Sequence, residues 1–332
     1  MAILASTPVP TANGWVPARD LRQNDIVFDQ DGQPQKVLLV QEYTPRECFS
    51  VQLDDGLTID GDSKLTLRLE TRKYRNRVSE YQNRTSTRYR KQFRRPLVDR
   101  QLEELHGAPL TKPDGRLEYS VPNCLPVQYA TRDLPVPPYV FGIWIASVTP
   151  RGRMWLRDKP LNKMRAIFRR YGFSIVTRKH KNGLILFDIR PSVRDSFLFA
   201  GHDIPKDLPV IYTDGAIEQR IELLEGLIDG GAIQKPKKGQ TFVMREANYH
   251  YIRKIQGVVE SLGIKTTLYT PTSHPYYLLK FSTTLLFKDE KPKKSRFTRR
   301  FVKNVVKIDA KPCVHIETPN QILVGEGYIP VC

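Results

Sequence analysis

A dense run of cations interleaved with tyrosines lies between residues 72 and 95, where Glu80 is the single acid. Guanidinium and ammonium groups neutralise phosphates, and tyrosine hydroxyls add hydrogen bonds to a nucleic-acid backbone. Few aliphatic residues are present, so the run cannot bury a core, and a solvated insertion loop is the structural alternative. We expect a DNA-contacting arm, because a solvated loop needs no such excess of cations. Its basic residues are Arg72, Lys73, Arg75, Arg77, Arg84, Arg88, Arg90, Lys91, Arg94 and Arg95.

The whole chain carries the same excess, with a formal net charge of +18 and a pI near 9.7 over 332 residues. Such a balance favours a polyanionic partner, most often nucleic acid. A membrane surface fits less well, because no basic helix with a broad apolar face accompanies the charge. No run of eighteen apolar residues and no secretory signal are found, so we expect a cytoplasmic protein.

The four cysteines are scattered and form no Cys-x-x-Cys pair. This pattern argues against a zinc site or a disulfide framework and is typical of a reducing compartment. The cysteines are Cys48, Cys124, Cys313 and Cys332.

Two helices near the middle of the chain must position any central site. In the segment 217–229, Ile217, Ile221, Leu224 and Ile228 fall on one helical stripe, with Leu223 and Leu227 beside it, and Gly230-Gly231 ends the helix. A buried amphipathic helix explains this pattern by itself. Upstream, the apolar segment 138–149 begins with a proline, which suits a first helical turn.

The amino-acid sequence of both segments resembles the helix signature of LAGLIDADG homing endonucleases. Leu224-Glu225-Gly226-Leu227-Ile228-Asp229-Gly230-Gly231-Ala232 is the closer copy, and Val140-Phe141-Gly142-Ile143-Trp144-Ile145-Ala146-Ser147 is the weaker one. The resemblance implies that the two helices pack through Gly142 and Gly226. It also implies that an acidic residue at each helix end holds the divalent metal ions that cut DNA.

The acids of that pattern are missing here, since their positions are held by Ser147 and Gly231. Neither residue offers a carboxylate to a hard cation such as Mg²⁺, and Asp229 comes two positions too early. We therefore expect no metal site and no cofactor, although Mg²⁺ would be required if the nuclease were active.

Short strands and turns are predicted over residues 2–70. Asn13-Gly14, Asp31-Gly32 and Asp55-Gly56 are hairpin signals between strand-like runs at 25–28, 36–40 and 48–53. The first segment, 2–27, resembles the opening splicing block of an intein, and the segment 313–330 resembles the closing blocks. Phage terminase-type inteins are the nearest match, and the layout implies a Hint-type splicing domain.

The groups that splicing requires are absent at the matching positions. Ala2 replaces the first nucleophile, Ser63 the activating His, and Cys332 stands where a terminal His-Asn pair is expected. Cys313 falls where some inteins that begin with Ala carry another nucleophile, but their partner Trp is Leu65 here. A packed β-residue is the simpler interpretation of Cys313, because a free cysteine is usually a small hydrophobe. We expect no splicing.

An internal duplication follows each motif helix. Helices at 161–172 and 251–263 and strands at 154–156, 173–177, 184–189, 241–244, 264–269 and 276–281 recur in the same order. Two α-β-β-α-β-β units imply a pseudo-two-fold saddle whose concave sheet suits duplex DNA. Its basic residues, each also explicable as an ordinary surface charge, are Arg151, Arg153, Arg178, Lys179, Lys181, Lys235, Lys237 and Lys238.

The sequence thus predicts an α+β protein, with an all-β Hint-like module split around an inserted pseudo-two-fold LAGLIDADG α-β-β-α-β-β duplication. We expect Hint-like parts at 1–70 and 286–332, a basic insertion at 71–132 and the endonuclease-like domain at 133–285. The expected partner is double-stranded DNA, bound by a monomer in a phage-infected or prokaryotic cell. Two alternatives stay open: an active Mg²⁺-dependent site-specific homing endonuclease, and a non-enzymatic DNA-binding regulator on the same scaffold.

Overall fold

The computed structural model divides the chain into two units. Unit 1 comprises Met1–Gln128, Glu260–Lys265 and Arg296–Cys332, and unit 2 comprises Tyr129–Val259 and Thr266–Ser295. The predicted boundaries at 70/71, 132/133 and 285/286 stay predictions. The structure describes residues 2–76, 97–147, 154–157, 161–172, 175–179, 184–189, 208–235, 241–271, 274–283, 286 and 299–332.

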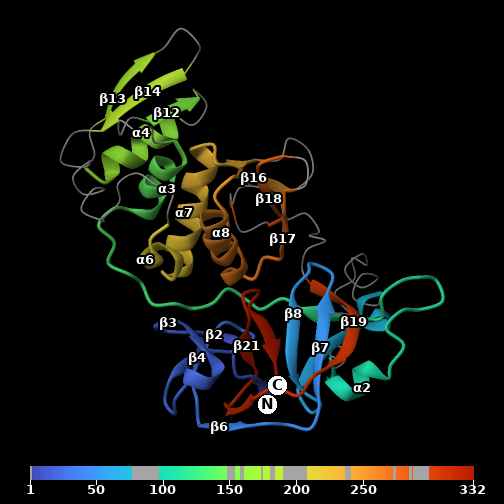
Figure 1. Ribbon diagram of the computed structural model, residues 1–332. Coiled ribbons are helices and arrows are strands. Elements are labelled where there is room, and N and C mark those ends of the chain that lie inside the picture. Colours follow the sequence, from blue (N-terminus) through green and yellow to red (C-terminus); the bar gives the residue numbers. More distant parts are fainter. Residues whose placement is uncertain are drawn as a thin grey trace, which may run out of the picture. The chain divides into compact units, whose positions relative to one another are not determined.

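Unit 1 is built on a nine-stranded sheet with the order β10-β9-β11-β19-β7-β8-β1-β20-β6. Every neighbouring pair described in it is antiparallel. The C-terminal strands β19 and β20 each lie between two strands from the earlier part of the chain, and Figure 1 shows β19 beside β7. A unit discontinuous in sequence is therefore continuous in space. The strands are β1 (Ala2–Leu4), β6 (Leu39–Tyr43), β7 (Cys48–Leu53), β8 (Thr58–Asp62), β9 (Thr66–Thr71), β10 (Val98–Gln101), β11 (Tyr119–Pro122), β19 (Arg299–Ile308) and β20 (Cys313–Glu317).

Smaller elements complete unit 1. A four-stranded sheet has the order β3-β2-β4-β5, and β21 pairs with β22 as a hairpin. The first sheet contains β2 (Pro8–Thr11), β3 (Gly14–Pro17), β4 (Ile26–Phe28) and β5 (Pro34–Lys36); the hairpin is β21 (Ile322–Val324) and β22 (Ile329–Val331); the helices are η1 (Ala18–Asp20) and α2 (Leu102–His106).

The predicted hairpin turns are confirmed, because Gly14, Gly32 and Gly56 all adopt positive φ at the ends of paired strands. The strand expected at 36–40 was wrong in its bounds. β5 ends at Lys36 and β6 begins at Leu39, because Val37 is fully buried while its backbone groups pair outside both strands.

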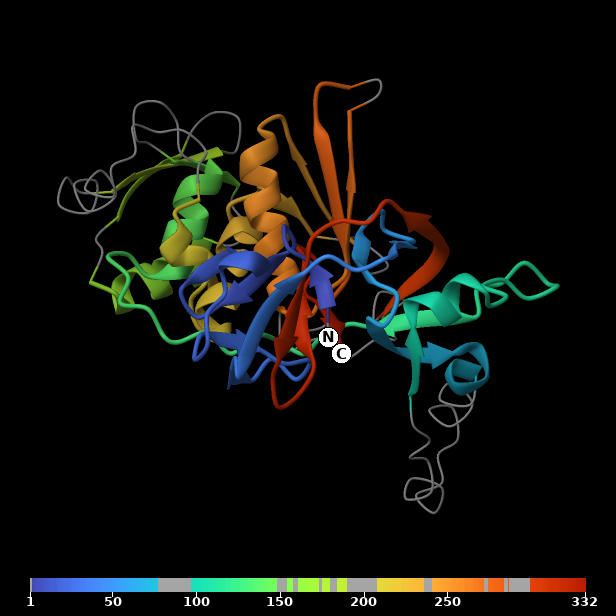
Figure 2. The ribbon, with the colours of Figure 1, turned by 60° about the horizontal axis from the view of Figure 1, so that its bottom comes forward.

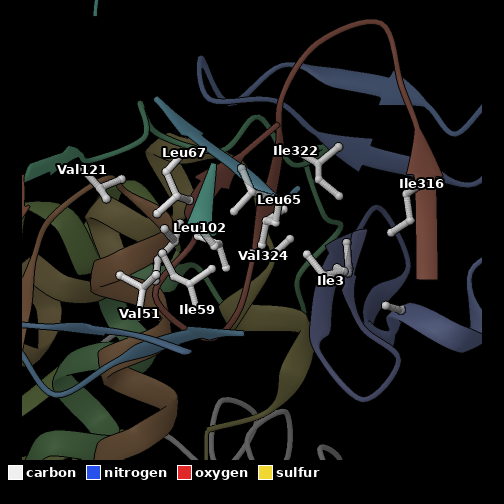
Figure 3. Packing of buried hydrophobic residues seen from close by; sticks show 14 of the residues in the cluster. Ile3, Val51, Ile59, Leu65, Leu67, Leu102, Val121, Ile316, Ile322 and Val324 are labelled. Atoms are coloured by element: carbon white, nitrogen blue, oxygen red, sulfur yellow. The ribbon is translucent and has the colours of Figure 1, made fainter. Parts of the chain in front are cut away.

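An apolar core joins the N-terminal and C-terminal parts of unit 1 (Figure 3). Alternate residues of β7 (Phe49, Val51 and Leu53) and of β9 (Leu67 and Leu69) belong to it, because successive side chains of a strand point to opposite faces. Its members from the two ends of the chain and from the middle include Ile3, Val51, Ile59, Leu65, Leu67, Leu102, Val121, Ile316, Ile322 and Val324.

Unit 2 contains the predicted duplication (Figures 1 and 2). Its first copy gives a three-stranded sheet, β12-β14-β13, and its second a four-stranded sheet, β15-β16-β18-β17. The first copy consists of α3 (Pro138–Ser147), β12 (Met154–Arg157), α4 (Leu161–Arg170), β13 (Ile175–Lys179) and β14 (Leu184–Ile189); the second consists of α7 (Ile217–Asp229), β15 (Ile233–Gln234), β16 (Phe242–Glu246), α8 (Tyr249–Ser261), β17 (Thr266–Tyr269) and β18 (Tyr277–Phe281), with the short α6 (Val210–Thr213) between the copies.

Each helix and strand predicted by residue range in this unit is found, with ends shifted by a few residues. The second copy has the predicted α-β-β-α-β-β order, whereas the described residues of the first copy show α-β-α-β-β. On α7, Leu224 and Ile228 of the predicted stripe are buried, as are Leu223 and Leu227 beside it. Ile217 and Ile221, at the start of the stripe, are only partly buried. No helix in the described part of the chain is both long and apolar enough to span a membrane.

The helices α3 and α7 touch through their backbones at the two motif glycines. A Cβ added at Gly142 would lie 2.4 Å from the Leu223 carbonyl oxygen, and one added at Gly226 would lie 2.3 Å from the Tyr139 carbonyl oxygen. Both gaps are far below van der Waals contact. The glycine packing that the motif implied is therefore confirmed.

We expect Gly142→Ala to lower the free energy of unfolding by about 1–3 kcal/mol, because the new methyl group would push the two helix backbones apart. Urea unfolding would measure the change. Gly257→Ala is the matched control, since Gly257 lies inside α8 with nothing within 4 Å of an added Cβ. It should stabilise by about 0.5–1 kcal/mol. Equal signs for the two variants would contradict the close helix contact.

Candidate functional site

The end of α7 is closed by a glycine cap of the Schellman type. The Ala232 N–H donates to the Leu227 carbonyl over 2.9 Å, the Gly231 N–H donates to the Ile228 carbonyl over 3.1 Å, and Gly231 has a φ of +90°. The residue at the position of the missing acid is thus the left-handed residue of the cap. It carries no side chain that could reach a metal ion.

Ser147 stands at the corresponding end of α3. Its Oγ donates to the Ile143 carbonyl, four residues back, over 2.6 Å. Asp229 lies two positions before Gly231 and is the acid nearest to it in the sequence. It accepts a 2.7 Å hydrogen bond from the Tyr139 hydroxyl. Burial, followed by the nearby Asp229 carboxylate, raises the pKa of Tyr139, so this phenol stays a hydrogen-bond donor.

These residues do not fit a Mg²⁺ site, because the two helix ends supply neither of the expected carboxylates. Among the residues that the structure describes, no group of three or more His, Cys, Asp and Glu side chains is placed to hold a metal ion.

One face of the second sheet of unit 2 carries polar side chains outward. In β16 and β18, Phe242, Met244, Leu279 and Phe281 are buried, and Gln256 on α8 donates to Thr266 of β17 over 2.9 Å on that inner side. Strand alternation therefore turns the intervening residues to the other face. That outer face carries Gln234, Val243, Arg245, Thr267, Tyr269, Leu278 and Lys280.

The charged residues of this face are supported by neighbours. Arg245 Nη1 donates to Gln234 Oε1 over 3.0 Å, and Lys280 Nζ lies 4.8 Å from the centroid of the Tyr269 ring. Arginine, glutamine and lysine are side chains that read base edges. Our sequence reasoning missed Arg245 and Lys280, although the alternation in 242–246 and 277–281 could have revealed them.

The structure brings together few of the predicted basic residues. Lys235 is exposed directly after β15. Arg178 lies in β13, but its side chain is outside what the structure describes. Lys179 also lies in β13, and its side chain is likewise outside what the structure describes. The remaining predicted residues of this set lie outside the described residues: Arg151, Arg153, Lys181, Lys237 and Lys238.

The described start of the basic arm is a helical turn at 72–76. Lys73 is exposed, whereas Arg72 Nη1 pairs with Asp114 Oδ2 over 2.6 Å. The remaining predicted contacts lie outside the described residues: Arg77, Arg84, Arg88, Arg90, Lys91, Arg94 and Arg95.

Arg75 must be removed from the predicted phosphate-binding set. Its Nη1 donates to the Glu70 and Glu118 carbonyls, each over 2.9 Å, and its Nη2 donates to the Leu117 carbonyl over 2.6 Å. Burial lowers the pKa of this guanidinium. Because its donors are used within unit 1, Arg75 is a structural residue.

The positions matching the splicing residues gather in unit 1, where the two chain ends lie next to each other in both views (Figures 1 and 2). Cys332 exchanges two backbone hydrogen bonds with Thr66, of 2.9 and 3.2 Å. A Cβ added at Gly61 would lie 2.6 Å from the Ala2 oxygen and 2.5 Å from Leu65 Cδ2. The segment 61–66 therefore holds both ends of the chain.

Ala2 is buried, and its direct partner across the ladder is His315. Opposite residues share one face of a sheet, so position 2 faces an imidazole. Sequence reasoning missed His315, because only the strand register shows this pairing. Ser63 lies in the turn between β8 and β9, where its carbonyl accepts from the Glu103 N–H over 3.2 Å.

Cys313, two residues before His315 on β20, is the ladder partner of Leu4 and is fully buried. Its Sγ is 3.9 Å from Cys48 Sγ. Burial, together with Cys48, raises the pKa of the Cys313 thiol to about 12. Because a neutral thiol is a weak nucleophile, this position acts as a packed residue near neutral pH.

No family model matches the chain. A replicative DNA helicase DnaB from Mycobacterium intracellulare is 25% identical over 351 residues, covering 99% of this chain and 58% of the helicase. The chain therefore spans a little more than half the length of this curated relative.

The solved structures that are similar to parts of the chain include an intein and a homing endonuclease. The MchDnaB-1 intein is 28% identical and aligns 53% of its length with 20% of this chain, at a TM-score of 0.20. The homing endonuclease I-DmoI in complex with DNA and Mn is 12% identical and aligns 89% of its length with 45% of this chain, at a TM-score of 0.31. Because both scores are low, the architecture rests on the strand order and helix packing described above. A terminase-type origin stays a prediction.

Proposed function

We propose that the chain is an intein-derived protein whose LAGLIDADG-like unit binds double-stranded DNA without cutting it, and that its Hint-like unit does not splice. The observation that carries this proposal is the pair of helix ends. Gly142 and Gly226 keep the backbones in contact, while Ser147 and Gly231 stand at the positions of the metal-binding acids. The similarity to a DnaB protein along almost the whole chain supports an intein-type origin.

DNA binding is supported by charge and by the outer face of the second sheet. The chain has a net charge of +18, and Gln234, Arg245 and Lys280 project from adjacent strands of that face. Phosphate neutralisation supplies affinity, and polar side chains on strands discriminate base pairs in the major groove. We propose a monomer, because the duplication already provides two copies of the sheet.

The first test is a titration with Mg²⁺ or Mn²⁺ on a plasmid library of candidate targets, scored for both retention and cutting. We expect retention that is equal in EDTA and in Mg²⁺ and that weakens with salt, with log K falling by about 0.9 per phosphate contact for each unit of log salt. Cutting that disappears with EDTA would establish the active nuclease instead. If neither retention nor cutting is observed, the chain is a scaffold without DNA affinity.

The second test changes a proposed base reader. We expect Arg245→Ala to weaken binding to a selected target by about 1–3 kcal/mol, because a bidentate contact to one base pair is lost. Binding to unrelated DNA should change far less. Arg19→Ala is the control, since Arg19 is an exposed arginine of unit 1. Equal losses on selected and unrelated DNA would show that Arg245 contacts only phosphate.

The third test places the chain between two reporter proteins. We expect the fusion to stay intact, because Ala2 offers no nucleophile and Ser63 replaces the activating imidazole. Denaturing electrophoresis would reveal joined or released reporters. Joined reporters would overturn the loss of splicing and direct attention to His315 and Cys313.

A further inference from the structure

Two buried cysteines of unit 1 meet across the nine-stranded sheet. Cys48 begins β7 and Cys313 begins β20, and β8 and β1 lie between these two strands in the sheet order. In a flat sheet such strands would be about 14 Å apart. The two Sγ atoms are nevertheless 3.9 Å apart, because the sheet curls at this point.

A carboxylate and a phenol complete a ring of side chains with the two thiols. Asp62 is the ladder partner of Cys48, and Tyr43 is the ladder partner of Cys313. Opposite residues of an antiparallel pair share one face of the sheet. The Tyr43 hydroxyl donates to Asp62 Oδ2 over 2.5 Å, which joins the two pairs. Leu4 packs against both cysteines and fills the space beside them.

The contact between the sulfurs is close enough for a bond to form without rebuilding the sheet. A disulfide is about 2.0 Å long, so the sulfurs must approach by about 2 Å. Rotation about the two Cα–Cβ bonds moves sulfur atoms by distances of this order. The strands themselves are held by their ladders on both sides, so the two cysteines stay opposed.

A small oxidant can enter beside Tyr43. This residue is partly buried, and it covers the cysteines together with Ile308. It lies on β6, which ends the order of the sheet and has a partner only in β20 among the strands that the structure describes. Local opening of an edge strand costs less free energy than global unfolding.

We propose that Cys48 and Cys313 form a reversible disulfide with hydrogen peroxide as the oxidant, and that this bond locks β7 to β20. One thiolate attacks an oxygen of the peroxide, the O–O bond breaks, and a sulfenic acid forms while hydroxide leaves. The second thiolate attacks the sulfenic sulfur, the S–S bond forms, and the S–O bond breaks with loss of hydroxide. Each hydroxide takes up a proton that a thiol has released, so the products are one disulfide and two water molecules. The cysteines are oxidised, and the peroxide is reduced.

The surroundings of the sulfurs make this reaction slow near neutral pH. Burial, the Cys48 thiol and the Asp62 carboxylate together raise the pKa of the Cys313 thiol to about 12. The titratable groups that face this thiol are Cys48 of β7, Asp62 of β8 and Tyr43 of β6. Because only the thiolate attacks, the rate rises with pH through the neutral and alkaline range.

The bond would act as a lock because it closes a long loop of the chain. Cys48 and Cys313 are 265 positions apart, so the cross-link restricts the unfolded chain far more than the folded one. It also removes Cys313 as a nucleophile for as long as it stays oxidised. This device does not depend on DNA binding by unit 2.

The experiment treats the full native chain with hydrogen peroxide, alkylates the remaining thiols in denaturant and maps the peptides by mass. We expect a linked peptide pair that contains Cys48 and Cys313, with two of the four cysteines left for alkylation. Dithiothreitol should restore all four thiols. The oxidised chain should unfold at a temperature several degrees above that of the reduced chain.

Matched variants separate this pair from general oxidation. Cys48→Ala and Cys313→Ala should each abolish the linked peptides and the thermal shift, whereas Cys124→Ala, at another buried cysteine, should keep both. The peptide map of the unaltered chain decides the matter even if a variant fails to fold. Four free thiols after treatment, or a link between another pair of cysteines, would overturn the proposal.

The role of the ring is tested by the rate. We expect Asp62→Asn to speed formation of the disulfide several-fold at fixed pH, because it removes a negative charge that opposes the thiolate, while the amide oxygen still accepts from the Tyr43 hydroxyl. Glu103→Gln is the control, since Glu103 is an exposed carboxylate on α2. Equal rates in both variants would overturn the arrangement of charges on which the proposal rests.

Discussion

The contact between α3 and α7 is the constraint on which unit 2 depends. Most apolar side chains of both helices are buried. At Gly142 and Gly226 the two backbones touch, and neither position has room for a Cβ. A third close approach follows at Gly230, where an added Cβ would lie 2.6 Å from Ala146 Cβ. This contact holds the two helix ends side by side. Whatever chemistry the site can perform is then set by the residues at those ends, 147 and 231.

Unit 1 is assembled from segments that are far apart in the sequence. The ladder between β7 and β19 joins residues some 250 positions apart, and a buried ion pair fixes its end, with Arg300 Nε donating to Asp55 Oδ2 over 2.7 Å. Both partners are almost fully buried, so removing one of them would leave an uncompensated buried charge. Lys265 adds a second pair to the same turn through Asp54.

Local patterns predicted the elements well, because their causes lie within a few residues. The stripe and Gly-Gly stop of α7 and the Asn-Gly and Asp-Gly hairpins needed no distant partner. Long-range contacts decided the rest. Within the basic run Arg75 was predicted to contact phosphate, yet its guanidinium donates to the Leu117 and Glu118 carbonyls, 42 and 43 positions away. His315 became relevant only through its register with Ala2.

The packing of the two helices and the chemistry at their ends depend on different residues, so glycines at 142 and 226 are compatible with non-acidic residues at 147 and 231. Replacing Gly142 or Gly226 would force two helix backbones apart, a cost felt by every molecule whether or not it cuts DNA. A carboxylate at a helix C-terminus instead opposes the macrodipole, and a second one nearby repels the first. Ser147 returns its hydrogen bond to its own helix, and Gly231 adopts the positive φ of the cap without strain. Under the proposed loss of cutting, serine at position 147 and glycine at position 231 both favour the folded state.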